Sequence, residues 1–319
     1  MKKTLYGLVA ASMLAISPAS HAAWPGERPI QMIVAYAPGG GTDIMARLVA
    51  RFAEERLPGS RFVVVNKPGA GGAIGFEEIA RSKPDGYTIG MINAPGFNFM
   101  PLYRNTNYKP EDFDILARVV ADPILIYAKK DSTVPKDLKA IIAQLKEKPE
   151  SLSFGHSGDG TVGHIGLLRM QEKEGFKANF IPFKGGADTR VSLAGGHIDY
   201  GLLTSGELPE AADPASAFVA VAQLSEQRQE RFSQVPTAGE LGVEIVTASE
   251  RGFAAPKGIP EEIRQRLETV LREILQDPKF IEAAKADAPV LSYKAGGDWA
   301  KQLQEESEAL KPLAEVMKK

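Results

Sequence analysis

The chain has 319 residues, of which 44% are hydrophobic, and its formal net charge at neutral pH is −2. This length predicts two domains with sizeable apolar cores, and the lack of a basic block argues against a nucleic-acid partner. The sequence contains no cysteine, which excludes thiol catalysis and thiolate metal sites.

The first residues have the pattern of a secretory signal peptide. Two lysines precede an apolar run at residues 5–18, and Ser20-His21-Ala22 offers small residues for cleavage. The apolar run is shorter than the roughly 20 residues that a membrane-spanning helix needs. We therefore expect residues 1–22 to be a cleaved leader and the protein to be periplasmic. An uncleaved anchor is the alternative.

Apolar runs of strand length alternate with helical patterns along the rest of the chain. The predicted strands are residues 30–35, 62–65, 87–92, 124–130, 152–155, 178–183, 197–204 and 218–224. The predicted helices are residues 42–57, 73–81, 135–145, 161–171, 187–193, 260–274 and 299–317. In the first helix the apolar stripe is Ile44, Leu48 and Phe52, with Met45 and Val49 beside it. This alternation predicts an α/β fold with largely parallel sheets.

The first glycine-rich loop joins a predicted strand that ends at Tyr36 to a helix that begins near Thr42. It contains Pro38, Gly39 and Gly40. Glycines let a ligand approach the main chain, and the first N–H groups of a helix have no internal partner, so such a loop suits an anion. Thr42 caps the helix or donates to a ligand, and Asp43 is a favourable acid in a first turn. From the residues alone, an anion site and an ordinary loop remain alternatives.

The second loop, GHSGDGTVGH at residues 155–164, also joins a predicted strand to a predicted helix. Its hydroxyls and its backbone N–H groups would be available to a ligand at the start of that helix. The two loops together therefore suit an anion held between two lobes. A further cluster, PFKGGAD at residues 182–188, contains Lys184, which either attracts an anion or is solvated at a strand end.

Several enzyme motifs are incomplete. GAGGAIG has Ile74 where a dinucleotide fingerprint needs glycine, and no glycine run is followed by the lysine of a phosphate loop. GHSGD resembles a nucleophile elbow, but Asp159 replaces its last glycine. An exported hydrolase that uses Ser157 with His164 is therefore a minor alternative. No zinc motif occurs, so we expect no metal, no cofactor and no enzymatic activity.

Seven motifs in order resemble one family, the periplasmic substrate-binding proteins of tripartite tricarboxylate transporters, also called the Bug family. They extend along almost the whole chain after the leader. The motifs are WPGERPIQMIVAYAPGGGTDIMAR, NKPGAGGAIG, KPDGYTIG, FGHSGDGTVGHI, PFKGGADTRVSLAGGHID, VPTAGELGV and GFAAPKGIPEEI.

The resemblance implies a two-lobed periplasmic binding fold of type II, with each lobe a mostly parallel sheet flanked by helices. The expected lobes are residues 23–121 with 247–319, and residues 122–246, and the final helix can pack across both. Hinges are expected near residues 121–122 and 246–251.

The resemblance also implies a small carboxylate, with two or three acid groups, bound in the cleft through main-chain N–H groups. The stretches matching the family's cleft are residues 38–43, 93–95, 157–161, 185–186 and 204–205. The residues expected to bind ligand are Tyr36, Pro38, Gly39, Gly40, Thr42, Asp43, Asn93, Ala94, His156, Ser157, Gly158, Gly160, Thr161, Gly185, Gly186, Thr204 and Arg251.

Two of these residues depart from the family pattern. His156 replaces a small residue, and Arg251 stands near a position that is often aromatic. Arg251 either contacts a distal carboxylate or is a surface arginine near the hinge.

The expected partners are a large and a small membrane subunit that receive the ligand from a monomeric receptor. Delivery of the ligand to a periplasmic sensor domain is the alternative.

Overall fold

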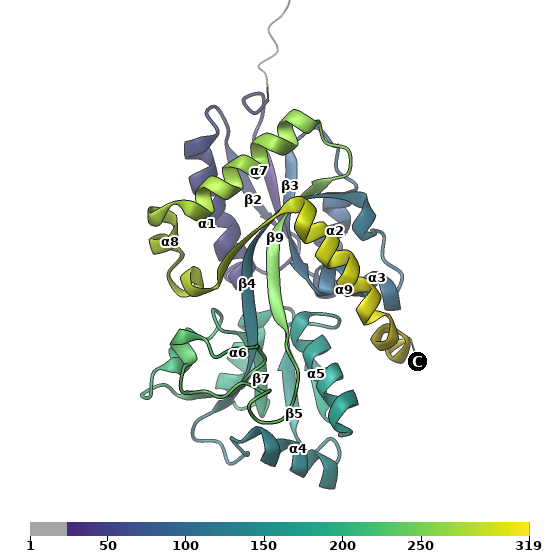
Figure 1. Cartoon of the computed structure of the whole chain (residues 1–319), viewed down its shortest axis with the longest axis vertical. Helices are drawn as coiled ribbons and strands as arrows, with labels where there is room; N and C mark the ends of the chain where they lie inside the picture. Colours follow the sequence, from purple (N-terminus) through teal and green to yellow (C-terminus); the bar gives the residue numbers. More distant parts are fainter. Residues whose placement is uncertain (1–23, 319) are drawn as a thin grey trace, which may run out of the picture.

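The computed structural model describes residues 24–318, so the predicted leader lies outside the described residues. The molecule has two lobes, and strands β4 (Phe113–Lys129) and β9 (Ala248–Pro256) cross the junction between them (Figure 1). No helix within residues 24–318 is long and apolar enough to cross a bilayer.

The upper lobe in Figure 1 is built on three parallel strands extended by β9 and β4. The parallel strands, in sheet order, are β2 (Phe62–Asn66), β1 (Ile30–Val34) and β3 (Thr88–Ala94). β9 and β4 join antiparallel, and β10 (Leu291–Ala295) pairs with β4. Apolar side chains cover both faces of β1, as expected for a parallel strand between two layers of helices.

Helices cover both faces of this sheet. One core contains side chains of α1 (Gly41–Arg56), α7 (Glu261–Gln276) and α8 (Pro278–Ala284). The other contains side chains of α2 (Ala73–Ala80), α3 (Gly96–Tyr103) and α9 (Gly296–Met317). A side chain at Gly75 would overlap Ala35, so the glycine lets α2 pack directly on the strand.

The lower lobe repeats the plan with β7 (Tyr200–Thr204), β5 (Ser153–His156) and β6 (Asn179–Pro182) in parallel. The end of β4 and β8 (Phe218–Gln223) join antiparallel. The helices of this lobe are α4 (Leu138–Glu147), α5 (Val162–Glu174) and α6 (Gly186–Ala194).

The C-terminal end of α9 packs against the lower lobe. Leu310 and Leu313 of α9 form a small core with Phe99 of α3 and Ile165 of α5. Helix α9 therefore contacts both lobes.

The structure corrects two expectations about elements. The strand predicted at 124–130 is the second half of β4, whose 17 residues pair with β9 before residue 124 and with β7 and β8 after it. The expected lobe boundary at residues 121–122 therefore falls inside a strand. The second expectation is the apolar stripe of α1. The side chains buried there are Met45, Val49 and Phe52, whereas Ile44 is 55% exposed.

Candidate functional site

The connections that leave the strands at the lobe junction line a single cavity. It is bordered by the loops before α1, α5 and α6, by the end of β3 and by the end of β7. These loops follow the carboxyl ends of parallel strands, where α/β sheets place their ligand sites. The cavity has a volume of about 60 Å³.

Eleven of the seventeen predicted site residues line this cavity. They are Tyr36, Gly40, Thr42, Asn93, Ala94, Ser157, Thr161, Gly185, Gly186, Thr204 and Arg251. They come from both lobes, although in the sequence they are separated by up to 215 residues from Tyr36 to Arg251.

The other six predicted residues, and Lys184, are not among the residues lining the cavity. Pro38, Gly39 and Lys184 are exposed. Asp43 is 3% exposed and accepts hydrogen bonds from Gly39 N at 3.0 Å and Asn66 Nδ2 at 2.8 Å. Asp43 therefore fixes the shape of the first loop. Burial raises the pKa of Asp43, but the hydrogen bond from Arg47, together with those from Gly39 and Asn66, outweighs burial and holds the pKa below its ordinary value.

The second loop is held in a similar way. Gly158 O accepts from Thr161 Oγ1 at 2.6 Å and lies 3.0 Å from His156 Nδ1. Gly158 and Gly160 have φ of 121° and 76°, which other residues rarely adopt. His156, Gly158 and Gly160 thus shape the loop that presents Ser157 and Thr161.

Three helices begin at the cavity wall without a side-chain cap. The N-caps of α1, α5 and α6 are Gly40, Thr161 and Gly185, and none of them accepts a capping hydrogen bond. The first N–H groups of a helix have no partner inside it, and the helix dipole makes this end positive. The cavity therefore presents three partly positive helix ends, which suit a small anion.

Arg251 of β9 lies at the same wall. Its side chain is buried, which excludes the surface arginine considered from the sequence. Arg251 Nη2 donates to Asp122 Oδ2 at 3.1 Å, and Nη1 lies 3.6 Å from Asp287 Oδ2. Burial disfavours the charged guanidinium, but Asp287 and Asp122 outweigh it and keep the pKa of Arg251 above its ordinary value.

Glu207 is a cavity residue that the sequence analysis missed. It follows β7 by three residues, and its Oε2 accepts from Thr204 N at 3.0 Å. Burial raises its pKa, opposed by that hydrogen bond and by Arg251. Glu207 lies just after the end of a strand and next to the predicted Thr204-Ser205 stretch. That position in the sequence could have identified it as a cavity residue.

A family model described as "Tripartite tricarboxylate transporter family receptor" matches residues 45–318. The chain belongs to this family.

The relatives of this receptor align with most of its length. Protein BugT of Bordetella pertussis is 33% identical over 294 residues, which cover 90% of this chain and 88% of that protein. The structure of the periplasmic binding protein BugD has 30% identity and a TM-score of 0.82, covering 91% of this chain and 98% of that one. The R. palustris protein Rpa4515 with adipate has 26% identity and a TM-score of 0.83, covering 92% and 98%. The family and the two-lobed α/β fold predicted from the sequence are confirmed.

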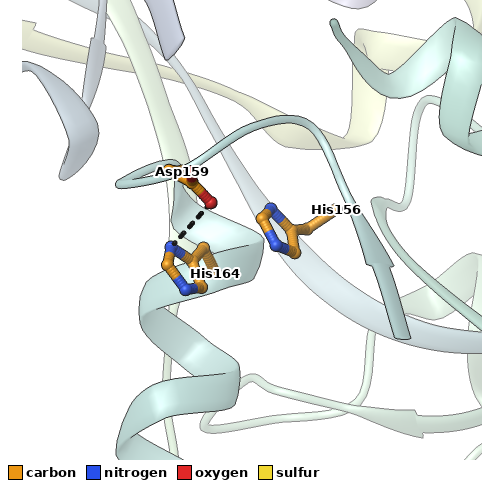
Figure 2. Close-up of side chains that lie close together, drawn as sticks. All are labelled: His156, Asp159 and His164. Atoms are coloured by element: carbon orange, nitrogen blue, oxygen red, sulfur yellow. Dashed lines mark ion pairs between the residues drawn. The ribbon is translucent and has the colours of Figure 1, made fainter. Parts of the chain in front are cut away.

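The receptor has two stacked histidines beside the second loop (Figure 2). The rings of His156 and His164 are parallel within 3°, with centroids 4.5 Å apart. Asp159 Oδ1 lies 3.8 Å from His164 Nδ1, and ligand atoms of the three residues lie within 4.8 Å of one another. Histidine binds a metal in the plane of its ring, and one ion cannot lie in two parallel planes. The arrangement therefore does not suit a metal ion.

The histidines are neutral at neutral pH. His164 Nδ1 accepts from Gly160 N at 3.0 Å, so this nitrogen carries no proton. Burial, with a smaller contribution from His156, lowers the pKa of His164 to about 3, and burial lowers that of His156. No hydrogen bond within residues 24–318 joins Ser157 to either ring, which gives the hydrolase alternative no support.

We expect this histidine pair to make stability fall in acid. Because the folded pKa of His164 lies below the unfolded value near 6.5, the unfolded chain binds more protons as pH falls from 6.5 towards 3, and unfolding becomes easier. By linkage, His164 should remove about 1–2 kcal/mol of stability between pH 8 and pH 5. The measurement is urea unfolding at both pH values. His164→Gln should lessen the loss, while His197→Gln, at an exposed histidine, should leave it unchanged. An equal loss in all three proteins would contradict the expectation.

Proposed function

We propose that this receptor binds a small carboxylate between its lobes and delivers it to the large and small membrane subunits of a tripartite tricarboxylate transporter. The observation that supports this most is the meeting of three uncapped helix starts at one cavity, beside the buried Arg251. The adipate in the related Rpa4515 structure is consistent with such a ligand.

Recognition by these groups needs no chemical step. The N–H groups of the helix starts and the hydroxyls of Thr42 and Ser157 would donate hydrogen bonds to the carboxylate. Closure of the lobes, about hinges near residues 121–122 and 246–251, would remove water and strengthen these contacts. On this proposal the seventeen residues predicted from the sequence divide into those that face the ligand and those, such as Asp43, that hold the loops.

The same proposal places the protein in the periplasm as a monomer without enzymatic activity. Delivery of the ligand to a periplasmic sensor domain uses the same cavity and remains the second candidate. Binding of either purified membrane subunits or a sensor domain to the liganded receptor would separate the two candidates.

A thermal-shift screen of residues 23–319 tests the ligand class. The panel contains mono-, di- and tricarboxylates, acidic amino acids and neutral sugars. A ligand at about 100 times its dissociation constant should stabilise the folded state by roughly 2.7 kcal/mol, which raises the unfolding temperature measurably. Shifts confined to carboxylates are expected. A shift with neutral sugars alone would overturn the anion site.

A further inference from the structure

Gly71, in the motif NKPGAGGAIG, belongs to the upper lobe but contacts the lower lobe. A Cβ built on Gly71 would lie 2.6 Å from the backbone oxygen of Asp159, which is part of the second glycine-rich loop. A Cβ built on Gly158 of the same loop would lie 3.5 Å from the Cα of Gly71. The approach to the Asp159 oxygen is too close for any side chain, so only glycine at position 71 permits this contact between the lobes.

The turn that carries Gly71 is fastened to the upper lobe. Tyr36 Oη donates to Gly71 O at 3.2 Å, and Arg104 Nη2 donates to Ala70 O. Gly71 itself has φ of 65° and ψ of 16°, a left-handed conformation within the short helical turn Ala70–Gly72. Because these hydrogen bonds hold the turn on the upper lobe, it cannot readily move aside to make room for a side chain.

The opposing loop of the lower lobe is also fixed. Gly158 O accepts from Thr161 Oγ1, which closes the loop on itself. The loop meets the upper lobe at a second point, since a Cβ built on Gly96, the first residue of α3, would lie 2.9 Å from Gly160 O. Two fixed backbone segments therefore face each other across the lobes, and the distance at which they meet limits how far the lobes can close.

We propose that Gly71 is the stop that sets the closed distance between the lobes, and that the lack of a side chain there lets them close fully on a ligand. The inference rests on the proposed function, in which closure accompanies binding. Gly71 is not among the residues lining the cavity, so it is a positioning residue that acts on affinity through closure. Tyr36 lines the cavity and donates to Gly71, and thus connects this stop with the site.

Gly71→Asn tests the proposal. Asparagine adopts the left-handed conformation more readily than most residues, so the substitution adds a side chain with little change in the turn. The matched control is Gly175→Asn, because Gly175 has φ of 69° and ψ of 39° and an added Cβ there meets no atom within 4 Å. Both variants should fold, with similar circular dichroism and similar unfolding temperatures in the absence of ligand.

The distance between the lobes is the direct readout. The sequence contains no cysteine, so spin labels can be attached at Lys83→Cys in the upper lobe and Val191→Cys in the lower lobe, both at exposed positions. Pulsed electron resonance measures the label separation with and without each carboxylate of the thermal-shift panel, beginning with succinate, glutarate and adipate. At least one acid should shorten the separation in the receptor with Gly71 and in Gly175→Asn, and should shorten it less in Gly71→Asn.

Calorimetric titration with the same acid gives the second readout. Gly71→Asn should bind it more weakly by roughly tenfold or more, because an overpacked contact opposes closure, while Gly175→Asn should bind as the unsubstituted receptor does. Equal shortening and equal affinity in all three proteins would overturn the proposal. Weaker binding by Gly71→Asn with the full shortening would also overturn it, since the residue would then not act through closure. If no carboxylate of the panel binds to the unsubstituted receptor, the proposed function fails and this inference fails with it.

Discussion

Replacing Arg251 with methionine should destabilise the receptor more than any other single change considered for this protein. Asp122 is fully buried and Asp287 is 6% exposed, and both face the Arg251 guanidinium. Removing one member of a buried ion pair leaves an uncompensated charge, at a cost of about 3–5 kcal/mol. That is a large part of the roughly 5–15 kcal/mol by which a folded protein is stable. Urea unfolding at pH 7 measures the loss.

The loss should shrink in acid. Burial already raises the pKa of Asp287, and Arg251 opposes this rise, so without the arginine Asp287 should take up a proton more readily. A carboxyl group whose folded pKa is raised makes the folded state relatively more stable as pH falls. Unfolding at pH 5 should therefore show a smaller difference between Arg251→Met and the unsubstituted receptor.

A matched control is Arg81→Met, which removes an arginine that is 66% exposed and pairs with Glu77 at the C-terminal end of α2. An exposed helical pair contributes only about 0.3–0.5 kcal/mol. If both substitutions cost the same, the buried cluster at the junction of the lobes would not be the stabilising unit that the geometry indicates.

Replacing Gly40 with phenylalanine should abolish ligand binding and leave the fold intact. Gly40 has φ of −80° and ψ of 165°, which any residue adopts, and an added Cβ would meet only Ala37 O at an ordinary 3.6 Å. The residue lines the cavity at the start of α1, so a ring there occupies the space in front of the Gly41 and Thr42 N–H groups. We expect affinity for the best carboxylate of the screen to fall at least about a hundredfold, which is roughly 2.7 kcal/mol.

The control is Gly297→Phe, at an exposed glycine near the start of α9 where an added Cβ meets no atom within 4 Å. It should bind as the unsubstituted receptor does. Circular dichroism and the unfolding temperature without ligand should be similar for all three proteins. Unchanged affinity in folded Gly40→Phe would exclude the first loop from the site.

The sequence by itself determined the family, the two-lobed α/β fold and the segments that reach the cavity. The reason is that these features depend on local patterns. The glycine-rich loops at residues 37–41 and 155–161 each follow the carboxyl end of a strand and precede a helix. In α/β folds, ligand sites form at these ends of the strands. Once the ordered motifs indicated the fold, the loops had to meet, and eleven of the seventeen predicted residues do line one cavity.

The tertiary structure decided what each charged side chain does. Asp43 looked like a residue for a ligand, but its carboxylate accepts from Gly39 and Asn66. Arg251 pairs with Asp122 and Asp287, which are 129 and 36 residues away in the sequence. No local pattern shows such pairings, because the charge of a site is the sum over side chains that distant strands bring together. The sequence analysis missed the crossing of β4 from one lobe to the other for the same reason, because the sequence of a strand does not show which other strands it pairs with.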